Sequence, residues 1–258
     1  MKTIISRDNP TYKQLKKLAE SGRERRKAGL TLLDGVHLVE TYAATGGTAE
    51  ILAVSASGAE RAECRLLLET VAARERLVLA DALFAEISPV ETPVGILVMI
   101  ATPRPQPPPQ PEFCLMLEDV QDPGNLGSIL RSAAAAGVQA AWLSAGCADA
   151  WSPKVLRAGM GAHFAMAIME GADLQEQLAS FRGLSVATSL DADKTLYGLD
   201  LTGRVALLVG NEGAGLSAGL LQAATERIRI PMPGKAESLN VAAAAAICFF
   251  ERVRQKMH

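Results

Sequence analysis

The feature that most constrains the fold is the repeated alternation of short apolar runs with helix-like segments. In the second half of the chain, strands are expected at residues 113–117, 140–143, 165–169, 185–189, 205–209 and 227–230, and helices at 126–136, 153–159, 174–181, 216–224 and 239–256. This pattern is typical of an α/β fold with a mostly parallel sheet covered on both faces. Ligands of such sheets gather at the carboxyl ends of the strands, so the loops there are the candidate site.

A proline-rich run divides the chain. Residues 102–112 read TPRPQPPPQPE, and six of these eleven residues are proline. Proline removes a backbone donor and fixes φ, so neither a helix nor a central strand continues through this run. We predict a linker at 102–112 between an N-terminal domain (1–101) and a C-terminal domain (113–258), with a long loop inside one domain as the alternative. Strands at 30–33, 51–54, 77–79 and 95–101 alternate with helices at 10–20, 36–44, 62–73 and 81–87, which predicts a small α/β N-terminal domain.

Composition excludes several classes of protein. Of 258 residues, 49% are hydrophobic, and the net charge is −2, so the chain as a whole is not a basic nucleic-acid coat. The four cysteines and three histidines are scattered without metal-ligand spacing, so no metal site is expected. The N-terminus lacks the apolar core of a signal peptide, and no apolar run reaches membrane-spanning length, so we expect a cytoplasmic protein without a membrane partner.

Positive charge is concentrated at the N-terminus. The first 27 residues contain nine Lys or Arg and three Asp or Glu, a net of +6 in a chain whose total is −2. This asymmetry predicts a surface that binds RNA phosphates, with Arg23, Arg25, Arg26 and Lys27 as the candidate contacts. The alternative is a solvated helix face, because lysine-rich surface helices are common.

The first motif that indicates chemistry is LEDVQDPGNLGSILRS at residues 117–132. Its Pro123-Gly124 pair signals a turn, and Asn125 is a natural helix cap. Arg131 follows six residues later in a helix of small and apolar residues. An arginine in that setting needs a partner, and phosphate or carboxylate is the usual one.

The second motif is LLVGNEGAGL at residues 207–216. Its GxxGxG spacing is neither the dinucleotide fingerprint GxGxxG nor a P-loop. Its glycines still allow a ligand to approach the backbone closely. Glu212 would repel phosphate, so the motif favours a ligand without one, such as a sulfonium cofactor that carries adenosine and an amino acid.

The third motif is IPMPGKAESLNV at residues 230–241, where an apolar strand end and a Pro/Gly turn precede an alanine-rich helix. Either Ser238 or Asn240 can cap that helix. A cap needs one such residue, whereas Glu237, Ser238 and Asn240 crowd the same helix start. The surplus of polar groups beside outward-pointing backbone donors indicates a site for a small polar ligand.

Together the three motifs resemble the SpoU (TrmH-type) family of S-adenosylmethionine-dependent RNA ribose 2′-O-methyltransferases, in the SPOUT superfamily. Residues 152–162 (SPKVLRAGMGA) look like the element that the family carries between its first and second motifs. Residues 17–40 resemble part of the family's small α/β substrate-binding domain, although Leu32 or Leu33 and Asp34 stand where the family usually has a large aromatic residue and Glu. The resemblance implies a C-terminal parallel-sheet α/β domain with a deep trefoil knot, and a homodimer with the active site near its interface.

The resemblance also implies roles for particular residues. The catalytic set is Asn125, Arg131, Glu212, Ser238 and Asn240, and the residues expected to bind S-adenosyl-L-methionine are Leu208, Gly210, Ile230, Met232, Ser238 and Leu239. Glu212 is expected to be a partly buried carboxylate that positions its neighbours, and Asn125 to hold substrate or orient Arg131. A guanidinium is a poor base near neutrality, so we favour Arg131 as a clamp on the substrate phosphate and hydroxyl over Arg131 as the base.

The substrate class follows from the same resemblance. An added N-terminal domain of this size is similar to those of ribosomal RNA enzymes, so ribosomal RNA is favoured and transfer RNA is the alternative. A non-catalytic RNA-binding or ribosome-assembly protein on the same fold is the rival from another class, and the presence of all five catalytic residues argues against it. A small-molecule nucleotide enzyme is a further alternative, which the glycine spacing and the lack of a catalytic His/Asp or metal cluster disfavour.

Overall fold

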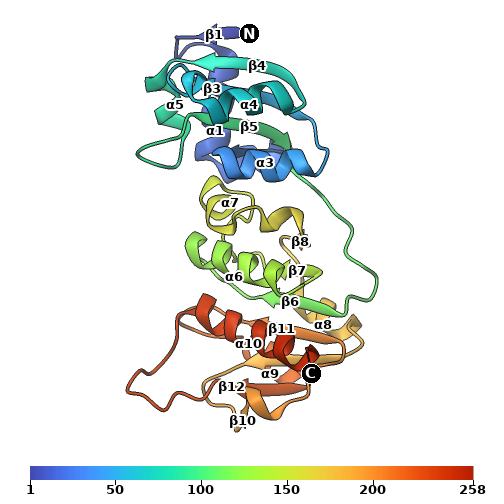
Figure 1. The fold of residues 1–258 in the computed structure, drawn as a ribbon. Helices are drawn as coiled ribbons and strands as arrows, with labels where there is room; N and C mark the ends of the chain where they lie inside the picture. Colours follow the sequence, from blue (N-terminus) through green and yellow to red (C-terminus); the bar gives the residue numbers. More distant parts are fainter. Residues whose placement is uncertain (258) are drawn as a thin grey trace. The chain divides into compact units, whose positions relative to one another are not determined.

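The computed structural model describes residues 1–257, which form two compact units (Figure 1). The first unit consists of residues 1–103 together with 151–164, and the second of residues 104–150 together with the chain from residue 165 onward. Among the described residues, no helix is both long enough and apolar enough to cross a membrane. The domain boundaries at 101 and 113 stay predictions. That residues 151–164 belong with the N-terminal unit is a feature that the sequence patterns did not indicate.

The first unit is built on a five-stranded sheet. Its strands are β1 (Lys2–Ile4), β2 (Leu30–Asp34), β3 (Ala49–Ser55), β4 (Ala73–Leu79) and β5 (Ile96–Ala101). Its helices are α1 (Pro10–Glu20), α2 (Gly22–Ala28), α3 (Val36–Ala44), α4 (Ala62–Thr70), α5 (Asp81–Ile87) and α7 (Pro153–Gly159), with 3₁₀ turns at Gly58–Glu60 and Ala162–Phe164. The strand order is β1-β4-β3-β5-β2. Strands β1, β4 and β3 are parallel, and β5 is antiparallel to β3 and β2.

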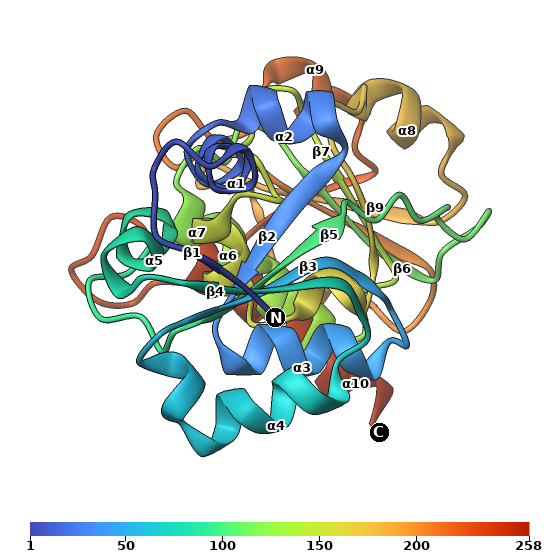
Figure 2. The ribbon, with the colours of Figure 1, turned by 90° about the horizontal axis from the view of Figure 1, so that it is seen from above.

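Helix α1 is fixed by its cap and by its apolar stripe. The Asn9 side chain accepts hydrogen bonds from the first amides of the helix, and Pro10 occupies the first turn, where its missing N–H costs nothing. Tyr12, Leu15 and Leu18 recur at helical spacing and are fully buried against the sheet. Figure 2 shows α1 and α2 on one side of this sheet and α3 and α4 on the other. The polar face of α1 therefore points outward beside α2.

Residues 151–164 extend the edge of the first unit at β2. The Thr31 hydroxyl donates a hydrogen bond of 2.6 Å to the Trp151 carbonyl. The His37 Nε2 lies 3.3 Å from the Met160 carbonyl oxygen, just beyond the end of α7. These contacts tie the segment to residues more than a hundred positions earlier in the chain.

The second unit is a seven-stranded sheet in which every neighbouring pair is parallel. Its strands are β6 (Phe113–Leu117), β7 (Ala140–Leu143), β8 (Ala167–Met169), β9 (Leu184–Thr188), β10 (Lys194–Thr195), β11 (Val205–Val209) and β12 (Glu226–Arg229). Its helices are α6 (Pro123–Ala135), α8 (Leu174–Ser180), α9 (Ala218–Ala223) and α10 (Val241–Lys256), with a 3₁₀ turn at Leu196–Gly198. The predicted mostly parallel α/β fold is confirmed. The trefoil knot stays a prediction.

The strand order of this sheet locates its binding edge. The order is β10-β12-β9-β11-β6-β7-β8, so the chain runs outward from β6 through β7 and β8 and then continues on the other side of β6. The direction of winding reverses between β6 and β11. Loops that leave the carboxyl ends of two such strands diverge and open a crevice, which is where ligands bind in open α/β sheets.

The starts of helices α6 and α10 are each fixed by a capping side chain. Helix α6 begins at Pro123 and is capped by Asp122, whose Oδ1 accepts from the Asn125 amide at 2.7 Å. The prediction that Asn125 is the cap is therefore wrong, because the turn comes earlier than expected. Helix α10 begins at Val241 and is capped by Asn240, one of the two predicted candidates.

Candidate active site

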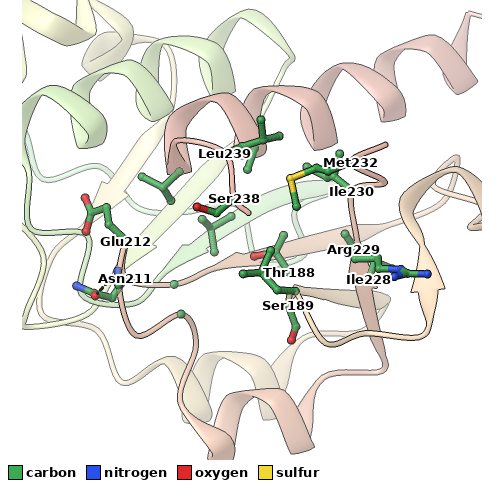
Figure 3. Close-up of a pocket in the computed structure, with 17 residues that line it drawn as sticks. Thr188, Ser189, Asn211, Glu212, Ile228, Arg229, Ile230, Met232, Ser238 and Leu239 are labelled. Atoms are coloured by element: carbon green, nitrogen blue, oxygen red, sulfur yellow. Dashed lines mark hydrogen bonds between the residues drawn. The ribbon is translucent and has the colours of Figure 1, made fainter. Parts of the chain in front are cut away.

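A pocket opens at the carboxyl edge of the second sheet, between the loops that follow β9, β11 and β12 and the segment that enters α10 (Figure 3). It is lined by Thr188, Ser189, Leu190, Val209, Gly210, Asn211, Glu212, Gly213, Gly215, Ile228, Arg229, Ile230, Met232, Ser238, Leu239, Val241 and Ala244. Figure 3 shows Asn211 and Glu212 on one side of the pocket and Ile230 and Met232 on the other. The second and third sequence motifs therefore face each other across one cavity.

The loop after β11 is held by its own hydrogen bonds. The Asn211 side chain accepts from the amides of Gly213 and Ala214 at 2.9 and 3.0 Å and donates to the Asp119 carbonyl at 2.8 Å. The backbones of Asn211 and Gly215 pair with each other in both directions. A Cβ atom on Gly210 would lie 2.2 Å from the carbonyl carbon of Gly215, so this tight turn requires glycine at 210. The loop thus presents a preorganised edge to the pocket.

Three of the predicted catalytic side chains form one hydrogen-bonded chain. The Asn125 Nδ2 donates to Glu212 Oε1 at 3.0 Å, and the Asn240 Nδ2 donates to Asn125 Oδ1 at 2.9 Å. The Asn240 Oδ1 in turn caps α10 by accepting from the Ala242 and Ala243 amides. Residues from three distant motifs are therefore joined at the pocket rim, where Glu212 lines the pocket and Asn125 and Asn240 do not, and the cap of α10 fixes one end of this hydrogen-bonded chain.

Glu212 is ionised at neutral pH. Desolvation of this carboxyl acts to raise its pKa, but hydrogen bonds from the Asn125 side chain and from nearby backbone amides, including that of Asp122, outweigh it and lower the pKa below its usual value. The residue is exposed, which corrects the expectation that it is partly buried. An ionised Glu212 is an obligate acceptor, so it fixes the orientation of the Asn125 amide.

The predicted cofactor residues divide into two groups. Gly210, Ile230, Met232, Ser238 and Leu239 all line the pocket. Leu208, by contrast, is fully buried inside strand β11 and packs in the apolar core of the second unit.

The Leu208 side chain therefore lies outside the pocket, and the predicted contact between Leu208 and the cofactor stays a prediction. Side chains alternate across a strand, so the pocket receives the next residue, Val209.

Arg131 is not part of the hydrogen-bonded chain formed by Glu212, Asn125 and Asn240. It is exposed on α6 and does not line the pocket. Within residues 1–257, no hydrogen bond or ion pair engages its guanidinium. Gly124, Ser128 and Ala135 are exposed on the same helical stripe, so no bulky neighbour covers it. The guanidinium is available to an anion from outside the chain.

The predicted RNA-binding cations are not equivalent. Arg23, Arg26 and Lys27 are exposed on α2. Arg25 is only 6% exposed, and its Nη1 donates to the carbonyl of Leu18 at 2.6 Å. The prediction that Arg25 contacts phosphate is therefore corrected: its guanidinium satisfies carbonyls at the end of α1.

Several pocket residues were not predicted. Thr188 is the last residue of β9, Ser189 and Leu190 follow it, and Asn211 shapes the glycine loop. The residues after β9 carry no motif, and only the position of β9 beside β11 brings them to the pocket. Asn211 carried a usable signal, because an asparagine after a glycine at a strand end commonly bonds its own turn.

The donor set fits S-adenosyl-L-methionine. The pocket has apolar walls that can pack against an adenine ring, formed by Val209, Ile230, Met232 and Leu239. The carboxylate of Glu212 attracts a sulfonium cation and repels a phosphate. Within the part of the chain that the structure describes, the backbone groups of residues 230–239 make no backbone–backbone hydrogen bond, which leaves them open to a ligand. Among residues 1–257, no cluster of three or more His, Cys, Asp or Glu side chains could hold a metal ion.

Comparisons with known proteins agree along the whole chain. The model of the SpoU rRNA methylase family matches residues 112–250, and that of the MRM3-like substrate binding domain matches residues 9–98. The chain is 35% identical to an uncharacterized tRNA/rRNA methyltransferase of Synechocystis sp., over 98% of this chain and 94% of the relative. It is 34% identical to the 23S rRNA (guanosine(2553)-2′-O)-methyltransferase RlmP of Bacillus subtilis, over 97% and 98% of the two chains. The crystal structure of the SpoU methyltransferase AviRb from Streptomyces viridochromogenes in complex with AdoMet matches with a TM-score of 0.88 at 28% identity, over 96% and 98%.

Proposed function

Because the chain belongs to the SpoU rRNA methylase family, we propose that it methylates a ribose 2′-hydroxyl of ribosomal RNA with S-adenosyl-L-methionine as the methyl donor. The observation that carries the proposal is the hydrogen-bonded chain Glu212–Asn125–Asn240 at the rim of a pocket with apolar walls and open backbone groups. When bound, the cofactor supplies an already activated methyl group. The protein therefore has to hold the two reactants in line and to remove the proton of the ribose 2′-hydroxyl.

The amide of Asn125 is suited to position the ribose. Its carbonyl oxygen accepts from Asn240, and one N–H donates to Glu212. An amide nitrogen carries two N–H donors, so one remains for an oxygen of the substrate. Ser238, whose hydroxyl lines the pocket beside this chain, adds a further donor and acceptor at the same rim.

Arg131 supplies positive charge for the RNA backbone. A guanidinium stays protonated near neutrality and binds phosphate through two parallel N–H donors. We assign it the role of a clamp on the phosphate next to the target ribose. Under that assignment Arg131→Lys lowers the rate but leaves the activity–pH profile unchanged, whereas a base role would shift the profile.

Four further assignments rest on the family resemblance. The substrate is ribosomal RNA, because the SpoU model and RlmP both carry that description and RlmP matches along its full length. The active form is a homodimer, which light scattering tests directly. A cytoplasmic location and the trefoil knot are expected on the same grounds.

The direct test is transfer of a radiolabelled methyl group from S-adenosyl-L-methionine to RNA by the purified chain, with ribosomal subunits and total transfer RNA as separate substrates. We expect incorporation into ribosomal RNA at a ribose, and strong loss of it in Arg131→Ala and in Asn125→Ala. Full methylation by both variants would overturn the assigned roles. Incorporation into transfer RNA alone would correct the substrate.

A further inference from the structure

The first unit carries a groove between α1 and α2, and the structure offers cations on both of its walls. The groove is lined by Lys13, Gln14 and Lys17 from α1 and by Glu24 and Lys27 from α2. We propose that this groove grips the sugar–phosphate backbone of the RNA substrate. The proposal rests on the proposed function, because it names the part of the first unit that holds the RNA.

Many of the N-terminal cations are already engaged elsewhere. Arg7 and Lys16 both bond to Glu86, and the Lys16 Nζ lies 2.9 Å from its Oε2. The Lys13 Nζ lies 2.8 Å from Asp8 Oδ1, although Asp8 is exposed and that pair exchanges readily with solvent. The raw count of N-terminal positive charges therefore overstates the charge that is available to RNA.

The cations left over gather at the groove. Within residues 1–257, neither Lys17 nor Lys27 forms an ion pair, and both are lining residues of the groove. Arg23 and Arg26 are exposed on the same short helix as Lys27. The groove is thus the place where unneutralised positive charge faces a concave surface. A phosphate chain releases condensed counterions when it binds such a surface.

Arg25 holds the two walls together. Its buried guanidinium donates to the carbonyl of Leu18 at 2.6 Å and to that of Ala19 at 3.4 Å, both in the last turn of α1. These bonds satisfy carbonyls that the helix end leaves open. They also fix α2 against α1, so that the backbone positions that carry Lys17 and Lys27 are set before RNA arrives, which lowers the entropic cost of binding.

The remaining lining indicates which form of RNA fits. The groove contains no aromatic side chain on which an unstacked base could lie. Its other polar groups are the amide of Gln14, which can bond a 2′-hydroxyl, and the carboxylate of Glu24, which repels phosphate from one part of α2. A surface of this kind recognises the backbone of a paired stem and does not read its sequence.

The test measures the salt dependence of RNA binding by anisotropy, with a fluorescein-labelled RNA hairpin as the probe. The test variant is Lys17→Ala/Lys27→Ala. The matched control is Arg61→Ala/Arg65→Ala, which removes two exposed arginines at α4 on the opposite face of the same sheet (Figure 2). Loss of two phosphate contacts lowers the slope of log K against log salt by about 1.4 to 1.8. The control is expected to keep the wild-type slope.

A converse variant guards against a folding artefact. Glu24→Gln removes the one carboxylate of the groove and is expected to tighten hairpin binding severalfold. A wild-type slope in Lys17→Ala/Lys27→Ala, an equal drop in the control, or no binding of the hairpin by the wild-type protein at low salt would each overturn the proposal.

Calorimetry with S-adenosylhomocysteine separates the two claims. The groove variants are expected to bind it as the wild type does. If the wild-type chain did not bind it while the slope effect persisted, the proposed methyl transfer would fail and the RNA groove would stand.

Discussion

Replacement of Asn125 by aspartate tests the hydrogen-bonded chain with little change in shape. The aspartate keeps an oxygen for the Asn240 Nδ2, which now lies 2.9 Å from Asn125 Oδ1. It replaces the Nδ2 that donates to Glu212 Oε1 at 3.0 Å with a second carboxylate oxygen. A donor–acceptor contact becomes a contact between two anions, and the rest of the site is untouched.

The size of the effect follows from that contact. A hydrogen bond to a charged acceptor contributes about 1.5 to 3 kcal/mol, and because Glu212 is exposed the lower part of that range applies. Repulsion between two unit charges about 3 Å apart in a water-like dielectric adds roughly 1 kcal/mol. If this energy is lost from the transition state, kcat/KM falls by about 100-fold.

The assay is single-turnover methyl transfer to ribosomal subunits. A double variant tests whether the lost rate can be restored. Asn125→Asp/Glu212→Gln exchanges donor and acceptor, so the glutamine amide donates to the new aspartate and the repulsion disappears. We expect it to recover most of the lost rate, because it restores a bond of about 1.5 kcal/mol and removes a repulsion of roughly 1 kcal/mol. Gln222→Glu on α9, an amide-to-acid change outside the pocket, is the matched control and is expected to keep the wild-type rate.

The pH dependence gives a second readout of the same contact. Two facing carboxylates raise the pKa of one of them, so as pH falls that group binds a proton and regains a donor. The rate of Asn125→Asp relative to wild type should therefore rise as pH falls. An Asn125→Asp variant with the wild-type rate, or an exchange variant no faster than Asn125→Asp, would show that the bond between Asn125 and Glu212 does not contribute to catalysis.

Three other changes have defined outcomes. Arg25→Ala should lower the free energy of unfolding by about 2 to 3 kcal/mol, seen as a lower urea midpoint, because buried carbonyls lose a charged donor; an unchanged midpoint would argue against its structural role. Burial raises the pKa of Asp34 against the opposing bond from Ser88, so as pH rises the unfolded chain ionises first and the folded state loses stability. Asp34→Asn should therefore raise Tm at neutral pH and have little effect at acid pH, and an equal shift at both would contradict this. Gly210→Ala should abolish binding of S-adenosylhomocysteine while the fold by circular dichroism persists, because the new Cβ meets the Gly215 backbone at 2.2 Å; retained affinity would show that the loop can relax.

Six of the seven strands of the second sheet were predicted from the sequence, and the two-residue strand β10 was missed. Residues 205–209 are apolar without interruption, and all five are buried between parallel neighbours. The first two motifs could be found because each places polar residues directly after a buried apolar strand, where parallel sheets hold ligands, whereas the polar residues of the third motif follow β12 only after a Pro/Gly turn. These local signals required no knowledge of the strand order.

The features that were missed depend on tertiary packing. A charge count cannot distinguish Arg25, which is buried against the end of α1, from the exposed Arg26 beside it. The cap of α6 is an exception, because Pro123 is favoured at the first position of a helix and was a local signal for Asp122 that the prediction did not use. The residues after β9 enter the pocket because β9 pairs with β11, a neighbour that follows it in sequence and that no local pattern specifies.

The most direct test of the central claim is calorimetric binding of S-adenosylhomocysteine to the purified chain without RNA, compared with Leu239→Arg. Leu239 lines the pocket and is 38% exposed, so an arginine there fills the cavity with little effect on the core. We expect one saturable site in the wild-type protein and its loss in the variant. Equal binding by both proteins would contradict the assignment of this pocket to the cofactor, and an absence of binding by the wild type, with or without RNA, would contradict the proposed methyl transfer.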